Sequence, residues 1–271
     1  MALILVIIVA LIFGRLAFLV LSGGAARSAG GYDGPEAQSA RLFTKDGFLN
    51  FVDRGVRSYP FGQVRQLETT LRDGSRALYE VDVESKEVCG FFHYDQAADE
   101  VKIDKERAAL IATGFARTHY SHFDEIGFVL ARESLVDFGL YGDKYYSFEW
   151  RKFDQESGAI LPYMVRVRVN AATGQVDSYL SLRKELKVST LPRVSREEAE
   201  RLALEALGKN RQVVQAELAV STVPLHQPGS RQALLWRITL EGEQDRMGYT
   251  PGETVFIDAH SGEVVHIEPY L

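Results

Sequence analysis

The side chains best suited to metal chemistry lie close together in His119-Tyr-Ser-His122, which is followed by Asp124. Two imidazoles three positions apart near a helix end, with a carboxylate close by, could hold a zinc ion. A simpler interpretation is that histidines in a last helical turn interact with the helix dipole and its free carbonyl groups. The first interpretation predicts a metal-dependent enzyme that uses His119, His122 and Asp124. We favour the second, which predicts no metal site.

Other catalytic patterns are absent from the sequence. It contains no His-Glu-x-x-His motif, no Gly-x-Ser-x-Gly elbow, no phosphate-binding Walker loop and no dinucleotide glycine fingerprint. Cys89 is the only cysteine, so no intramolecular disulfide can form, and its apolar neighbours favour a small buried side chain over a redox thiol. We therefore expect no catalytic residue, no bound metal and no cofactor.

Composition also limits the functions that the chain can have. The net charge is −6, whereas general nucleic-acid binders usually carry a basic surface. Hydrophobic residues make up 46% of the 271 residues, which is enough for a packed core in one or two domains. We therefore expect a folded protein that does not bind nucleic acid.

A ten-residue pattern occurs three times and indicates how the chain is organised. It combines apolar residues, an Asp or Asn, a Ser or Thr, a Gly or Lys, and a final Val. The Asp or Asn stands at 82, 170 and 258, a spacing of 88 residues each time. An Asp or Asn oxygen can cap a tight turn, and glycine permits the positive φ that closes it. The predicted turn residues are Asp82, Asn170, Gly174, Asp258 and Gly262. Lys86 replaces glycine in the first copy, so that turn either avoids a positive φ or accepts strain.

The first part of the chain has the composition of a membrane segment. Residues 2–21 include fifteen Leu, Ile, Val or Phe, and Arg15 is their only charged residue. The apolar residues favour insertion by roughly 4.5 to 9 kcal/mol, which exceeds the cost of up to about 3 kcal/mol for one arginine. We expect residues 1–22 to be a transmembrane anchor or uncleaved signal, and residues 23–40 to be a flexible tether.

Helix signals and alternating apolar residues define the rest of the chain. We expect helices at 46–56, after Asp104, and after the Ser195-Arg-Glu-Glu198 capping box, with several strands following each. This predicts an α+β protein in which an N-terminal transmembrane helix precedes tandem units, each a helix packed on a three- or four-stranded antiparallel sheet. The expected units are residues 41–102, 103–188 and 193–271, of which the first is the least regular.

Aromatic residues on the expected strands suggest a second kind of site. Tyr145, Tyr146, Trp150 and Trp236 could form a contact surface for a peptide or another ligand. Trp150 and Trp236 stand on equivalent strands, 20 and 22 residues before the Asn or Asp of the next turn. Packing against the helices explains these residues equally well, so core packing is the simpler interpretation.

The residues from Ser195 to Leu207, the Leu235-Trp-Arg-Ile-Thr-Leu240 strand and the turn at Asp258 together resemble a PepSY domain. Residues 104–186 are similar to the YcdB/YcdC repeat of the same PepSY/YpeB group, and residues 79–88 to a degenerate copy. The resemblance implies a noncatalytic module, usually outside the cytoplasm, that restrains or localises proteases and cell-wall hydrolases. It implies no catalytic residues.

Membrane orientation is predicted differently by two considerations. Arg27, Arg41 and Lys45 follow the apolar segment and no basic residue precedes it, so the positive-inside rule favours a cytoplasmic domain. The PepSY resemblance favours the extracytoplasmic side, and we follow it because a bias of a few charges is weak. We thus expect a single-pass membrane protein that binds a protease or cell-wall hydrolase through a strand edge or sheet face. The alternatives are the metal-dependent enzyme and an envelope-complex scaffold.

Overall fold

The computed structural model describes residues 31–94, 100–137, 144–208, 210–225, 230–243 and 251–270. The expected membrane anchor at 2–21 lies outside these residues. Among the residues that are described, none of the helices is long and apolar enough to cross a membrane.

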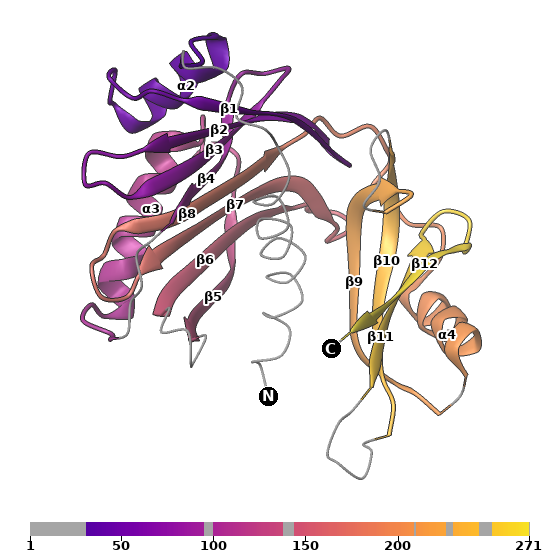
Figure 1. The fold of residues 1–271 in the computed structure, drawn as a ribbon. Coiled ribbons are helices and arrows are strands. Elements are labelled where there is room, and N and C mark those ends of the chain that lie inside the picture. Colours follow the sequence, from indigo (N-terminus) through magenta and orange to yellow (C-terminus); the bar gives the residue numbers. More distant parts are fainter. Residues whose placement is uncertain are drawn as a thin grey trace. The chain divides into compact units, whose positions relative to one another are not determined.

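Three helices and twelve strands make up the described part of the chain (Figure 1). The helices are α2 (Pro35–Thr44), α3 (Lys105–His119) and α4 (Arg196–Leu207). The first eight strands are β1 (Val52–Tyr59), β2 (Gly62–Thr70), β3 (Arg76–Asp82), β4 (Val88–His93), β5 (Val129–Asp137), β6 (Lys144–Phe153), β7 (Ile160–Asn170) and β8 (Val176–Arg183). The last four are β9 (Gln212–Val223), β10 (Arg231–Glu241), β11 (Gly252–Asp258) and β12 (Val264–Tyr270).

All twelve strands are linked by pairing into one mixed sheet. The order is β1-β2-β3-β4-β8-β7-β9-β10-β11-β12, and β5 joins through β6, which pairs with β7. Most pairs are antiparallel hairpins, but Ile160 of β7 pairs with Ala219 of β9 in parallel. The predicted α+β fold of separate units, each a helix on its own three- or four-stranded antiparallel sheet, was therefore wrong. Alternating apolar and polar residues predicted the strands. They could not predict which strands pair, such as β4 with β8, where Phe91 lies opposite Tyr179.

Two compact units can be distinguished within the chain. The N-terminal unit comprises the described residues of 26–152 and 162–185, and the C-terminal unit those of 153–161 and 186–271. Strand β7 contributes to both, because its first two residues belong to the C-terminal unit and the remainder to the N-terminal unit.

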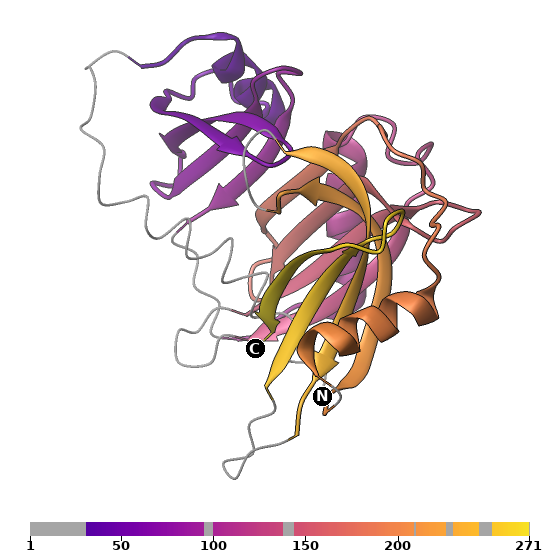
Figure 2. The same ribbon diagram turned by 90° about the vertical axis from the view of Figure 1, so that its right-hand side faces the viewer.

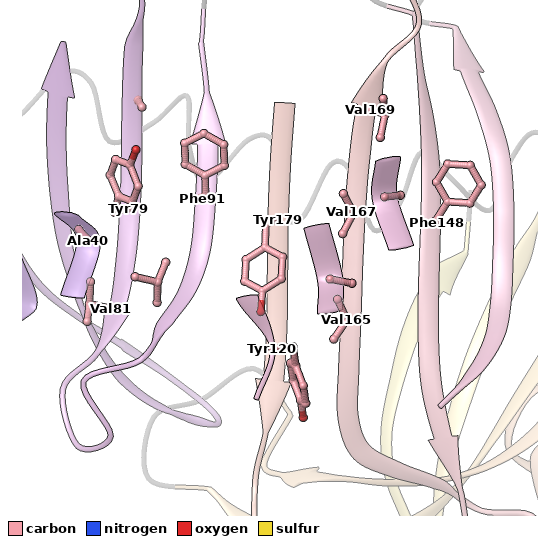
Figure 3. Packing of buried hydrophobic residues seen from close by; sticks show 14 of the residues in the cluster. Ala40, Tyr79, Val81, Phe91, Tyr120, Phe148, Val165, Val167, Val169 and Tyr179 are labelled. Carbon is pink, nitrogen blue, oxygen red and sulfur yellow. The ribbon is translucent and has the colours of Figure 1, made fainter. Parts of the chain in front are cut away.

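In the N-terminal unit, α2 and α3 cover one face of the strands (Figure 1). Side chains from neighbouring strands, including Tyr79, Phe91 and Tyr179, lie side by side on that face (Figure 3). Helix α3 presents fully buried alanines at a spacing of four residues, at 108, 112 and 116. Small side chains on this helical stripe let the helix backbone approach the sheet closely.

The C-terminal unit has its own core. Helix α4 lies along one face of β9 to β12 and buries Ala199 and Ala203 against them (Figure 2). Of the predicted capping box, the Glu198 carboxylate pairs with Arg201 within the helix. The N-cap is confirmed, since the Ser195 hydroxyl accepts a hydrogen bond of 3.2 Å from the Glu198 N–H. Asp104 caps α3 in the same way, through a bond of 2.7 Å from the Arg107 N–H.

The helix predicted at 46–56 was wrong. That segment contains the start of β1, which pairs antiparallel with β2. The helix lies earlier, where Pro35 opens α2 in its first turn and Lys45 ends it with a φ of 57°. It begins inside the segment that we expected to act as a tether. A proline at the first helical position was the sequence signal for this helix.

Candidate functional site

The three predicted turns have the same hydrogen-bond geometry. In each, a side-chain oxygen of Asp82, Asn170 or Asp258 accepts bonds of 2.9 to 3.0 Å from the N–H groups two and three residues ahead. The carbonyl of the same residue accepts a bond of 2.8 to 2.9 Å from the N–H four residues ahead. That fourth residue has a positive φ, of 76° at Gly174 and 79° at Gly262. The Asp or Asn is thus used by the backbone of the turn.

Lys86 takes the place of glycine with a φ of 61°, so the first turn accepts the strained conformation. The lysine also binds α2, because its Nζ lies 2.8 Å from Oε1 of the buried Glu36. Asp82 in turn forms an ion pair of 2.9 Å with Lys184. Burial opposes ionisation of Asp82, but hydrogen bonds from the turn N–H of Ser85 and from Lys184 lower its pKa. These contacts fix the turn within the N-terminal unit.

A fourth turn of this kind was missed in the sequence. The Asp154 carboxylate accepts a bond of 2.9 Å from the Ser157 N–H, and the Gly158 N–H donates to the Asp154 carbonyl at 3.0 Å. Gly158 has a φ of 72°. The signal was present as Asp154-Gln-Glu-Ser-Gly158, but it falls outside the spacing of 88 residues.

The second and third predicted turns also hold the segments that lead into α3 and α4. The Ala171 carbonyl accepts bonds from the N–H groups of residues 102 and 103, and the Ala259 carbonyl from those of 193 and 194. The Ala171 N–H donates to the residue 144 carbonyl, and the Ala259 N–H to that of residue 234. Tyr146 and Trp236 therefore occupy equivalent positions, and Trp150 lies on the equivalent strand four residues further along.

The four aromatic residues predicted as a contact surface are buried, at 6 to 9% exposure. Tyr146 donates to the Ile103 carbonyl at 3.2 Å, and Trp236 donates to the Val194 carbonyl at 2.9 Å. Trp150 packs on Phe123 and Phe148, and the Tyr145 ring lies against the Arg168 guanidinium. These four side chains therefore belong to the packing of the two units.

The histidine cluster is not brought together as a metal site. The His119 ring packs between Phe43 and Phe115, with centroid distances of 4.0 and 4.2 Å. Burial, together with the charge of Lys45, lowers the pKa of His119 to about 4. His122 instead lies 3.0 Å from Glu125, and Asp124 pairs with Arg117. Among the described residues, no group of three His, Cys, Asp or Glu side chains is placed to hold a metal ion.

Cys89 is packed into strand β4. Its thiol donates to the Glu80 carbonyl at 3.4 Å, and burial raises the pKa of the thiol. The Glu80 carboxyl, which is partly buried, accepts from Tyr59 at 3.0 Å and from Gln66 at 2.8 Å. Burial raises the pKa of Glu80 as well, although these two donors oppose the shift. A protonated thiol is a poor nucleophile, so the geometry gives Cys89 a packing role.

A buried ion cluster lies on the face of the sheet that α2 and α3 do not cover, and it was not predicted from the sequence. The Glu149 carboxylate lies 2.5 Å from Arg151 on its own strand and is also paired with Arg166 of β7. Burial alone would raise the pKa of Glu149, but the two guanidinium groups outweigh it and lower the pKa to about 2. Charged residues alternating with apolar ones in β6 and β7 were the available signal.

Three of the described strands, β1, β5 and β12, form edges of the sheet. An edge exposes unpaired backbone groups, which charges, bulges or prolines often protect. Strand β12 carries Pro269. Strand β1 contains Gly55 at a bulge, and its Asp53 and Arg54 are held in ion pairs.

Strand β5 exposes more large apolar side chains than the other two edges, although its Glu133 and Asp137 are held in ion pairs with Lys105 and Lys144. It has one bulge between Leu130 and Arg132, but it contains neither glycine nor proline. Its register with β6 is unbroken from Arg132 to Asp137. Val129, Leu130 and Leu135 are 54, 43 and 44% exposed. Strand β5 is therefore the candidate site at which this protein could bind a partner.

Comparisons with known proteins give distant likenesses. No protein-family model matches the chain, and no curated protein matches it. Among solved structures, it is similar to the Bacillus megaterium YpeB C-terminal domain, with a TM-score of 0.48 and 18% identity over 90% of this chain and 100% of that one. An uncharacterised protein from Eubacterium rectale has a TM-score of 0.41 and 10% identity over 86% of this chain and 80% of that one. At these TM-scores, neither likeness identifies a function.

Proposed function

We propose that this chain is a noncatalytic module that binds an extended segment of a protein partner by strand addition at β5. The observation that carries the proposal is the exposed edge of β5, with three large apolar side chains along nine residues. Backbone groups on such an edge give affinity for an added strand, and the neighbouring side chains give specificity.

Two further features agree with a binding role. The residues that could have formed a catalytic or metal site are used for packing, as at His119 and Cys89, or for an exposed ion pair, as at Asp124. The edge is also held firmly, because Leu130 and Leu135 lie opposite the buried Trp150 and Tyr146. A rigid template lowers the entropic cost of ordering a bound segment.

The nature of the partner follows from the PepSY resemblance in the sequence. It suggests a protease or a cell-wall hydrolase, and it suggests that the folded part works outside the cytoplasm, near the membrane. The proposed binding at β5 does not depend on that identity.

Site-specific crosslinking in intact cells tests this function. A photoreactive amino acid is placed at Leu135 in β5 and, as a matched control, at Ile267 in β12, which is 40% exposed. We expect a protein captured from position 135 and not from position 267. After purification, that protein should bind the wild-type chain and fail to bind a Leu130→Lys, Leu135→Lys variant that keeps the native circular dichroism spectrum. The same proteins captured at both positions, or equal binding to the variant, would refute the proposal.

A further inference from the structure

We infer that the segment bound at β5 alternates apolar and acidic side chains. The inference rests on the proposed function and adds the chemistry of the partner. Successive residues of a strand point to opposite faces of a sheet, so each face of β5 determines which side chains it accepts.

On the face that α3 covers, the edge carries Leu130 and Leu135, with Glu133 between them in an ion pair with Lys105. Leu130 lies opposite Trp150 and Leu135 opposite Tyr146, and both of these aromatic residues belong to the buried core. The two leucines remain more than 40% exposed because no described strand lies beyond them. An added strand would place every second side chain beside these leucines, where apolar groups would be removed from water.

On the opposite face, β5 carries Val129, Arg132 and Ser134, and further arginines lie on the neighbouring strands β6 and β7. Arg132 lies opposite Glu149, whose carboxylate is already shared by Arg151 and Arg166. Arg168 follows on the same face of β7, and Asp177 lies near it. These four guanidinium groups and two carboxylates together carry a positive charge, although the net charge of the whole protein is −6. Arg132 is the outermost of the four, and its side chain is exposed. Carboxylates on an added strand would lie directly beside it.

A second copy of the chain fits this edge poorly. In an antiparallel pair of two β5 strands related by a two-fold axis through residue 133, Glu133 would lie opposite its own copy. The two faces that carry the arginines would also adjoin each other. Like charges that lie opposite one another destabilise strand pairing. The charges therefore favour a partner segment of opposite sign over self-association.

Three labelled peptides test the inference by fluorescence anisotropy with the full-length protein. Each has ten residues that alternate Val with Glu, Gln or Lys, and is N-methylated on one edge so that it cannot pair with itself. We expect the Glu peptide to bind about fivefold more tightly than the Gln peptide, and the Lys peptide most weakly. The preference should shrink as salt is added.

Charge reversal shows whether Arg132 is responsible. The Arg132→Glu variant should reverse the order of the Glu and Lys peptides. Arg117→Glu, on an exposed position of α3, changes the net charge equally and should preserve the order. Equal binding of all three peptides to the wild-type protein would overturn this inference and leave the proposed function standing. Binding of none of them would overturn both.

Discussion

Replacing Glu149 by glutamine should destabilise the N-terminal unit strongly at neutral pH. The Glu149 side chain is 6% exposed, and the Arg166 side chain that pairs with it is only 11% exposed. Glutamine keeps the shape but removes the charge, so the guanidinium of Arg166 would stay buried without a counterion. Removing one partner of a buried ion pair costs about 3 to 5 kcal/mol.

The pKa of Glu149 gives a second measure of the same effect. Its ordinary value of 4.5 is lowered to about 2 in the folded protein. This difference corresponds to roughly 3 kcal/mol of folding free energy at pH 7. Because the folded pKa is the lower one, the stabilisation is present above about pH 4.5 and is lost as the pH falls towards 2. The loss caused by Glu149→Gln should therefore fall to less than about half by pH 3.

Urea denaturation followed by tryptophan fluorescence can measure this unit separately. Each unit contains one tryptophan, so a Trp236→Phe background leaves Trp150 as the reporter of the N-terminal unit. Glu133→Gln is the matched control, because the ion pair of Glu133 with Lys105 is exposed and should be worth at most about 1 kcal/mol. The reasoning is refuted if Glu149→Gln costs no more than the control, or costs as much at pH 3 as at pH 7.

Three further predictions follow from the turns and the aromatic cluster. Gly262→Ala should cost about 1 kcal/mol in urea denaturation because its φ is 79°, whereas Gly114→Ala, at an exposed position within α3, should gain about 0.5 to 1 kcal/mol. Similar costs for the two would contradict the assigned backbone conformation. Asp154→Ala and Asp258→Ala should each destabilise the C-terminal unit by about 1 to 2 kcal/mol, through lost bonds to turn N–H groups. An Asp154→Ala variant with unchanged stability would show that the fourth turn is dispensable. His119 should remain neutral at pH 5.5 in an NMR titration, since its folded pKa of about 4 lies below the ordinary 6.5. The stability that it contributes is present above about pH 6.5 and is lost as the pH falls towards 4, and a midpoint near 6.5 would contradict its burial.

Short-range features of the fold were readable in the sequence because their partners lie within a few residues. The caps at Asp104 and Ser195 each depend on a hydrogen bond that spans three residues. The turn geometry at Asn170 is of the same kind, as its side chain binds backbone N–H groups two and three positions ahead. Residue type and spacing are sufficient to specify such contacts.

The tertiary structure alone decided which strands pair and which side chains are buried. The pairing of Phe91 with Tyr179 joins segments 88 residues apart, and no local pattern distinguishes it from other pairings of half-buried strands. The ion cluster at Glu149 depends on the approach of β6 to β7, which brings Arg166 to the carboxylate. The sequence could not show that β5 is an exposed edge for the same reason. Whether a strand lies at an edge depends on how all the other strands pair.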